Sequence, residues 1–106
     1  MKLNGHILWV DDEIHHLKPH ILFLETKGYA VSTATNGNDA EILNKENKYD
    51  LILLDQTMPG IDGIDTLKKL KKHRLTIPII MITKSEDEWL MNEAISNQVN
   101  QFLIKP

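Results

Sequence analysis

The sequence predicts a single α/β domain in which helices cover both faces of a parallel, doubly wound sheet. Short β-rich runs alternate along the chain with longer helical patterns, as in repeated βαβ units. The runs contain few polar residues, which favours strands buried on both faces. A chain of 106 residues has room for one hydrophobic core. The expected strands are residues 7–10, 30–35, 51–54, 79–83 and 101–104.

Apolar residues recur at spacings of three and four between the expected strands, which predicts amphipathic helices. Pro19 lies inside the first pattern, where it would remove a backbone donor, so we expect this helix to begin only at about residue 15 or 16. A weaker pattern at 40–43 follows a turn-like segment, and Gly28 stands where the first helix should end. The stronger patterns are Ile14, Leu17, Ile21 and Leu24; then Ile64, Leu67 and Leu70; then Leu90, Met91, Ala94 and Ile95.

Composition narrows the class of protein. The formal net charge of -3 gives no basic surface for a phosphate backbone, so we expect no direct nucleic-acid binding by this chain. No apolar stretch reaches the roughly 20 residues that a membrane span needs, and no signal-peptide pattern opens the chain. Cysteine is absent, which excludes disulfides and cysteine nucleophiles. We therefore expect no membrane contact and a cytoplasmic location.

Four of the five expected strands end in polar residues, at the edge where doubly wound sheets bind ligands. Carboxylates brought together there repel one another unless a hard cation such as Mg²⁺ holds them, and Mg²⁺ suits phosphoryl chemistry. A lysine could neutralise a transferred phosphoryl group, and a threonine hydroxyl could donate one hydrogen bond to it. The strand-end residues are Asp11, Asp12 and Glu13, then Asp55, then Thr83 and Lys84, and finally Lys105.

Each of these residues also has a purely structural interpretation. The acids after the first strand could cap a helix, and Asp55 alone is more often a turn former before a Pro-Gly turn than a reactive group. Thr83 alone suits a strand, and Lys105 alone is usually a solvated charge. The prediction of a site therefore rests on all four strand ends together.

The residues at these strand ends give the chain its resemblance to the receiver domain of two-component response regulators, which extends over essentially its whole length. The resemblance is carried by ILWVDDE, DLILLDQTMPGIDG, PIIMITK and FLIKP, around the first, third, fourth and fifth strands. Their spacing also agrees, with 43 positions from Asp12 to Asp55, 28 more to Thr83 and 22 more to Lys105. The resemblance implies one receiver domain over residues 1–106, with a flavodoxin-like fold and strand order 2-1-3-4-5.

The resemblance also implies the chemistry of the site. Asp55 would accept a phosphoryl group from a partner histidine kinase and become an aspartyl phosphate. Asp12 would bind Mg²⁺ directly, Asp11 largely through water, and the backbone carbonyl of Thr57 would complete the protein ligands. Lys105 would pair with the phosphoryl group. Such a domain is not a conventional enzyme, although it supports its own phosphotransfer and autodephosphorylation.

A conformational switch is implied as well. Thr83 would move toward the phosphoryl group and Phe102 would turn inward behind it, a population shift biased by charge at Asp55. The bond between Lys105 and Pro106 is expected to be cis, an isomer that proline makes accessible. The output would lie in a downstream domain or an effector protein.

Two departures from the family pattern stand out. Lys84 follows the switch threonine where a small residue is usual, and the chain ends at Pro106, before the usual fifth helix. We therefore expect a fragment of a longer regulator, with apolar surface near the fifth strand open to solvent and a homodimer as one outcome. A narrower resemblance, carried by ILWVDDEI, LKPHI and MITKSE, is to PorX-type regulators of the type IX secretion system.

Rival functions remain at this point. A Mg²⁺-dependent phosphatase with an aspartyl nucleophile would need a second acid two residues on, where Thr57 stands. A flavin or dinucleotide site would need a phosphate-binding loop after the first strand, and that position is acidic. A receiver-like binding or dimerisation module that is never phosphorylated is the main alternative. His15, His16 and His20 fit a polar helix face better than a metal site.

Overall fold

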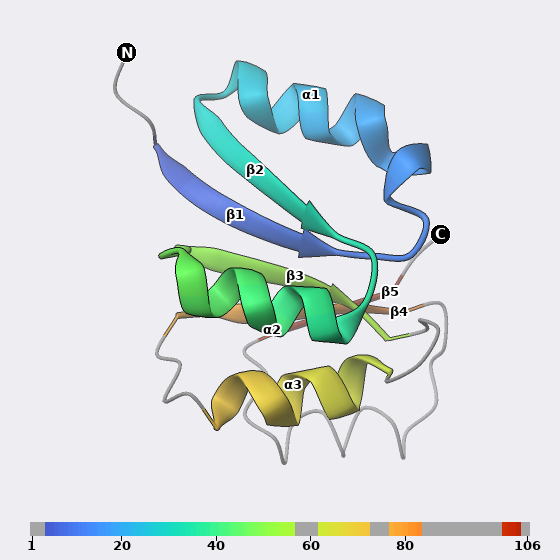
Figure 1. Cartoon of the computed structure of the whole chain (residues 1–106). Coiled ribbons are helices and arrows are strands. Elements are labelled where there is room, and N and C mark those ends of the chain that lie inside the picture. Colours follow the sequence, from blue (N-terminus) through green and yellow to red (C-terminus); the bar gives the residue numbers. More distant parts are fainter. Residues whose placement is uncertain (1–3, 57–61, 73–76, 84–100, 105–106) are drawn as a thin grey trace.

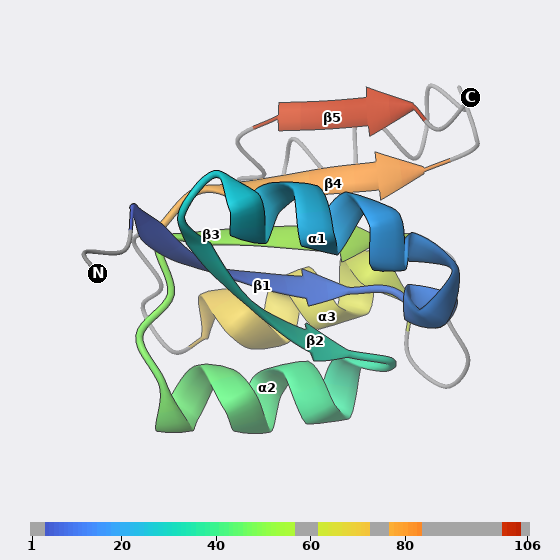
Figure 2. The same ribbon diagram turned by 90° about the horizontal axis from the view of Figure 1, so that it is seen from above.

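The computed structural model describes residues 4–56, 62–72 and 77–83 and the backbone of residues 101–104. Five parallel strands form one sheet in the spatial order β2-β1-β3-β4-β5, which confirms the predicted fold and strand order. Figure 2 shows β2 at one edge of the sheet and β5 at the other. The strands are β1 (Gly5–Val10), β2 (Tyr29–Ala34), β3 (Leu51–Asp55), β4 (Ile79–Thr83) and β5 (Gln101–Ile104).

Helices cover both faces of the sheet, as the alternation of patterns predicted. A 3₁₀ turn, η1 (Ile14–Leu17), leads into α1 (Lys18–Thr26), which lies on one face. The helices α2 (Gly37–Glu46) and α3 (Gly63–Lys71) lie side by side on the other face (Figure 1). The helix expected around residues 90–95 falls outside the described residues.

The boundaries of α1 follow from two residues with restricted backbones. Pro19 occupies the second position of α1, where a missing N–H leaves no intrahelical bond unmade. The helix starts late, as predicted, but at Lys18, because the 3₁₀ turn occupies residues 15 and 16 where the start was expected. Gly28 has a φ of 91°, a conformation that favours glycine, and it follows the end of α1 as expected.

The other two helices begin at side-chain caps. The Asn36 side chain accepts a hydrogen bond from the Asp39 N–H at 2.8 Å at the start of α2. Asp62 Oδ1 accepts one from the Asp65 N–H at 2.9 Å at the start of α3. Each cap satisfies a backbone donor that has no partner within its helix.

The main core lies between the sheet and the helices α2 and α3. Its buried side chains come from the inner positions of β1, β3 and β4 and from one face of each helix. Burying a single large aliphatic side chain contributes roughly 1.5–3 kcal/mol, so this layer carries most of the apolar stabilisation. The core residues are Leu8, Val10, Ala34, Ala40, Tyr49, Ile52, Leu54, Ile64, Leu67, Leu70, Ile79 and Met81.

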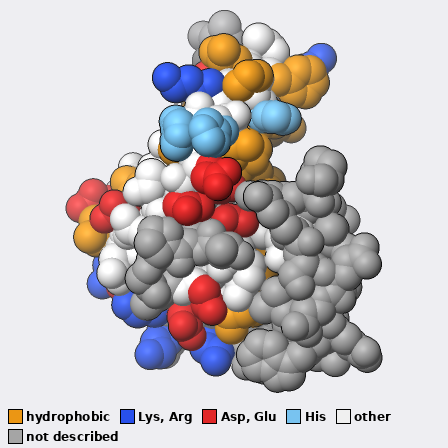
Figure 3. All heavy atoms as spheres, turned by 90° about the vertical axis from the view of Figure 1, so that its right-hand side faces the viewer, with side chains coloured by type: hydrophobic (Ala, Val, Ile, Leu, Met, Phe, Trp, Pro, Cys, Tyr) orange, Lys and Arg blue, Asp and Glu red, His pale blue; other side chains and the backbone are white. Residues whose placement is uncertain are grey.

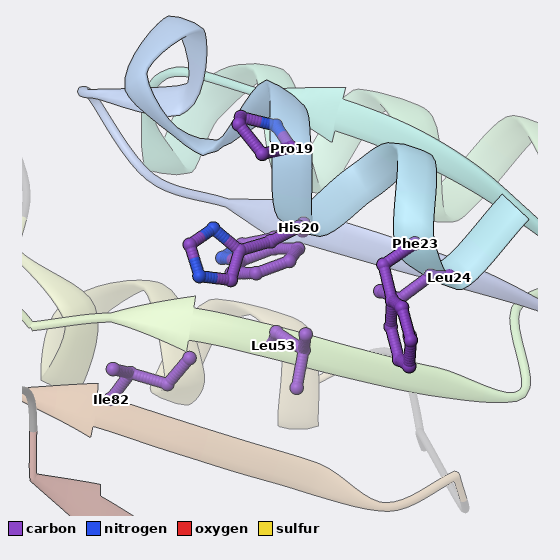
Figure 4. A pocket seen from close by; sticks show the side chains of 7 residues that line it. Pro19, His20, Phe23, Leu24, Leu53 and Ile82 are labelled. Atoms are coloured by element: carbon purple, nitrogen blue, oxygen red, sulfur yellow. The ribbon is translucent and has the colours of Figure 1, made fainter.

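The opposite face of the sheet is only partly covered. No residue of α1 is buried, and a groove of about 380 Å³ separates α1 from β1, β3 and β4. In Figure 4, Phe23 and Leu24 of α1 face Leu53 of β3, and Ile82 of β4 lies farther along the same groove. Leu53 and Ile82 are accordingly half-buried.

The expectation that all strands are buried on both faces was wrong for this side of the sheet. It was also wrong for β2, whose residues are mostly half-buried because β2 is an edge strand. The apolar surface expected near β5 falls on side chains that are not described. Exposed apolar surface is present instead on α1, where the side chain of Phe23 is 59% exposed.

Candidate functional site

The register of the sheet brings together acids that lie far apart in the sequence. Val10 of β1 pairs with Leu54 of β3. Asp11 directly follows Val10 and Asp55 directly follows Leu54, so the two acids lie at the same level of neighbouring parallel strands. The Asp11 N–H donates to the Ala34 carbonyl at 3.0 Å, which extends the ladder between β1 and β2 by one bond. The backbone at this end of the sheet is thus held in place by its neighbours.

Three carboxylates meet at this edge. One oxygen from each of Asp11, Asp12 and Asp55 lies within 4.8 Å of the others. Asp11 and Asp55 are almost fully buried, at 1% and 4% exposure, whereas Asp12 is more open to solvent. Figure 3 looks onto this side of the molecule and shows acidic side chains gathered beside the histidines. A cluster of hard oxygen ligands with one accessible member suits Mg²⁺, as the sequence predicted.

The loop after β1 is shaped by one of these acids. Asp11 Oδ1 accepts a hydrogen bond from the Glu13 N–H at 2.9 Å, and the Asp11 carbonyl accepts one from Ile14 at 3.2 Å. These bonds turn the chain back on itself and start η1. Asp11 therefore acts as a turn former as well as a member of the cluster, so both interpretations of this residue apply.

Thr83 lies close to the cluster in the topology of the sheet. Asp55 pairs with Ile82 of β4, and Thr83, the next residue, is 2% exposed at the end of that strand. Phe102 of β5 pairs with Met81 of β4, so the two predicted switch residues, Thr83 and Phe102, lie on adjacent strands. The side chain of Phe102 is not described.

Several predicted site features fall outside the described residues. Thr57, which would supply a carbonyl ligand, and Lys105, which would pair with the phosphoryl group, are among them. The same is true of Lys84 and of the expected cis bond before Pro106.

The histidines do not join the acidic cluster. His16 Nδ1 lies 3.6 Å from Glu13 Oε2, and the rings of His15 and His16 lie 4.1 Å apart. His20 instead lines the groove beneath α1. In the described part of the chain, the acidic cluster is the one group of three or more His, Cys, Asp or Glu residues that could hold a metal.

Gln56 is a contact residue that the sequence did not reveal. Its side-chain Oε1 accepts a hydrogen bond from the Ile64 N–H at 2.9 Å, and its carbonyl accepts one from Gly63 at 2.9 Å. Both bonds tie the residue after Asp55 to the start of α3. The available signal was a glycine directly before the first apolar residue of the helical pattern, which indicates close approach of another backbone.

Comparison with known proteins identifies the family. The chain matches the response regulator receiver domain over residues 7–106. It belongs to this family. Receiver domains are parts of response regulators in two-component systems, so this assignment confirms the resemblance. The narrower resemblance to PorX-type regulators stays a prediction.

Individual relatives agree with this assignment. The transcriptional regulatory protein ResD of Bacillus subtilis is 37% identical over 100 residues, which are 94% of this chain and 41% of that protein. SrrA of Staphylococcus aureus is 36% identical over 98% of this chain and 43% of its own length. This receiver domain therefore spans about two fifths of the curated relatives it matches.

A solved structure agrees as well. TrrA of Thermotoga maritima, determined in complex with Mg²⁺ and BeF, is 29% identical and has a TM-score of 0.83. The match covers 100% of this receiver domain and 88% of that chain.

Among the described residues, no helix is both long enough and apolar enough to cross a membrane.

Proposed function

We propose that this receiver domain accepts a phosphoryl group on Asp55 from a histidine kinase. The observation that carries the proposal is the position of Asp55, a buried carboxylate at a strand end within 4.8 Å of the ligand atoms of Asp11 and Asp12. A lone buried acid would be costly, whereas an acidic cluster at the carboxyl edge of a doubly wound sheet suits a cation and a phosphoryl group.

The transfer needs no separate general base, because a carboxylate is already a nucleophile. An oxygen of Asp55 attacks the phosphorus of a phosphohistidine, the new O–P bond forms, and the P–N bond breaks. The electron pair of that bond stays on the imidazole nitrogen, which is protonated as it leaves. The contribution of the protein is mainly positioning and charge neutralisation.

Mg²⁺ is the cofactor that fits the cluster. Asp12 and Asp55 would bind it directly, Asp11 largely through water, and the Thr57 carbonyl would complete the protein ligands. The Glu13 N–H already occupies one oxygen of Asp11, which supports a less direct role for that residue. When bound, the ion would supply positive charge that holds the carboxylates ionised and balances charge on phosphoryl oxygens.

The proposed readout of phosphorylation is a conformational switch through Thr83 and Phe102. Thr83 is buried at the end of the strand next to that of Asp55, which supports this assignment. Lys105 would balance phosphoryl charge, and Thr83 and Phe102 would change position together. The output would lie in a downstream domain or an effector protein; ResD, of which this chain matches 41%, is named as a transcriptional regulatory protein. A homodimer is one form that the output could take.

The proposal is tested by incubating the protein with acetyl phosphate and Mg²⁺ and measuring its intact mass. We expect one labile phosphate on the wild type and none on Asp55→Asn. Asp50→Asn is the matched control, because Asp50 is an exposed acid at the opposite end of β3. Labelling of Asp55→Asn at the wild-type rate would overturn the assignment. A wild type that takes no label, from acetyl phosphate or a kinase, would favour the unphosphorylated binding module.

A further inference from the structure

Gln56 is held between two elements by three hydrogen bonds. Its N–H donates to the Ile82 carbonyl of β4 at 3.0 Å, and its carbonyl accepts from the Gly63 N–H at 2.9 Å. Its side-chain Oε1 accepts from the Ile64 N–H, also at 2.9 Å. The residue directly after Asp55 is therefore fixed to the sheet on one side and to α3 on the other.

Gln56 satisfies two backbone donors at the start of α3. The N–H groups of the first residues of a helix have no partner within it. In α3, Gln56 accepts the first two, from Gly63 and Ile64, and the Asp62 side chain accepts the third, from Asp65. A side-chain carbonyl eight positions earlier in the chain thus replaces a local cap for Ile64.

The helix also packs directly on the backbone of the phosphoacceptor. A Cβ built on Gly63 would lie 2.6 Å from the Asp55 carbonyl oxygen and 2.7 Å from Gln56 Cα. These distances leave no space for a side chain, so α3 and the end of β3 touch backbone to backbone. The Gln56 contacts therefore lie directly beside the peptide that carries Asp55.

We propose that Gln56 is a positioning residue for Asp55, one that sets the direction of the acceptor carboxylate by fixing its backbone against α3. The inference rests on the proposed phosphorylation of Asp55. Group transfer is sensitive to placement, since a displacement of about 1 Å can cost on the order of 10²-fold in rate. The Gln56 side chain takes no part in bond making; it acts through the position of its neighbour.

The test compares variants that keep or remove the acceptor at Gln56. Gln56→Met has similar length but offers only a weak thioether acceptor to the Ile64 N–H, whereas Gln56→Glu keeps an oxygen acceptor. We expect the rate constant of phosphorylation by acetyl phosphate, at saturating Mg²⁺, to fall about ten-fold in Gln56→Met. It should stay within about three-fold of the wild type in Gln56→Glu. Should Gln56→Met not fold, Gln56→Ala removes the same acceptor with less bulk.

A second helix supplies the control for a merely structural role. Asn36→Leu removes the cap of α2, which lies outside the acidic cluster, and should lower the urea midpoint without changing the rate constant of the folded protein. If Gln56→Met loses stability but is phosphorylated at the wild-type rate, its effect is only structural. The positioning role is then overturned, while the proposed function stands. If the wild type takes no label, the proposed function fails and this role fails with it.

Discussion

Asp11 and Asp55 are nearly inaccessible acids placed beside each other, an arrangement that costs free energy in the absence of compensating charge. Asp12 adds a third carboxylate at the open side of the cluster. Sites that bind a cation often store such repulsion, because the residues are selected for the bound state. We therefore expect a cation bound at the acidic cluster to raise the stability of the protein.

Asp12→Asn tests this balance, because it removes one charge from the more exposed member. With a chelator present, we expect the free energy of unfolding to rise by about 1 kcal/mol, since one repulsive pair at each buried acid is lost. With Mg²⁺ added, the wild type should gain stability and Asp12→Asn should gain little. Urea denaturation with and without Mg²⁺ measures both effects, with Asp50→Asn as the control. Equal stabilisation of both proteins by Mg²⁺ would contradict a role for Asp12 as a ligand.

At the scale of elements, α3 and β3 behave as one unit around the candidate site. The short contact at Gly63 and the two bonds to Gln56 join the end of the strand to the start of the helix. The helix also buries Leu67 and Leu70 in the main core, so packing fixes its later turns as well as its start. The packing of α3 on the core therefore also restricts the movement of a site residue at the end of β3.

Gly63→Ala is predicted to destabilise the domain although alanine is the better helix former. Helix propensity favours alanine by about 1 kcal/mol, but the added Cβ would lie 2.6 Å from a backbone oxygen that cannot rotate away. We expect a net loss of about 2 kcal/mol in the free energy of unfolding, measured by urea denaturation. Unchanged or increased stability would show that α3 can move away from Asp55 at no cost, which would also weaken the positioning role of Gln56.

At the scale of the whole molecule, the two faces of the sheet differ. One face is sealed by α2 and α3, whereas the other carries α1 with no buried residue and a groove of about 380 Å³. Leu22 and Phe23 on α1 are 60% and 59% exposed. Exposed apolar groups beside an open groove favour association between molecules. This face is the one on which the protein is expected to self-associate.

Phe23→Ser is predicted to reduce self-association. Because Phe23 is already mostly exposed, its loss should change the free energy of unfolding by less than about 1 kcal/mol. Sedimentation velocity over a range of concentrations measures the association directly. The matched control is Ile42→Ser, which removes an apolar side chain of 52% exposure from α2 on the opposite face. An equal effect of both variants would exclude the groove face as the contact surface.

The acids of the cluster show what could be predicted of the site. Asp11, Asp12 and Asp55 were identified from their positions after apolar strand patterns, since the carboxyl ends of parallel strands share one edge. Gln56 was missed because its role depends on contact with residues seven and eight positions later in the chain. Periodicity does not report such a contact.

The sequence alone determined the types and approximate limits of the described helices and strands, and the chemistry at the strand ends. It could do so because the hydrophobic period and the restricted backbones of Pro19 and Gly28 act locally. Only the tertiary structure decided that Asp11 and Asp55 are neighbours in register, that α3 packs on the backbone of Asp55, and that one face of the sheet stays open. These features depend on contacts between segments far apart in the chain, whose free energies no local pattern contains.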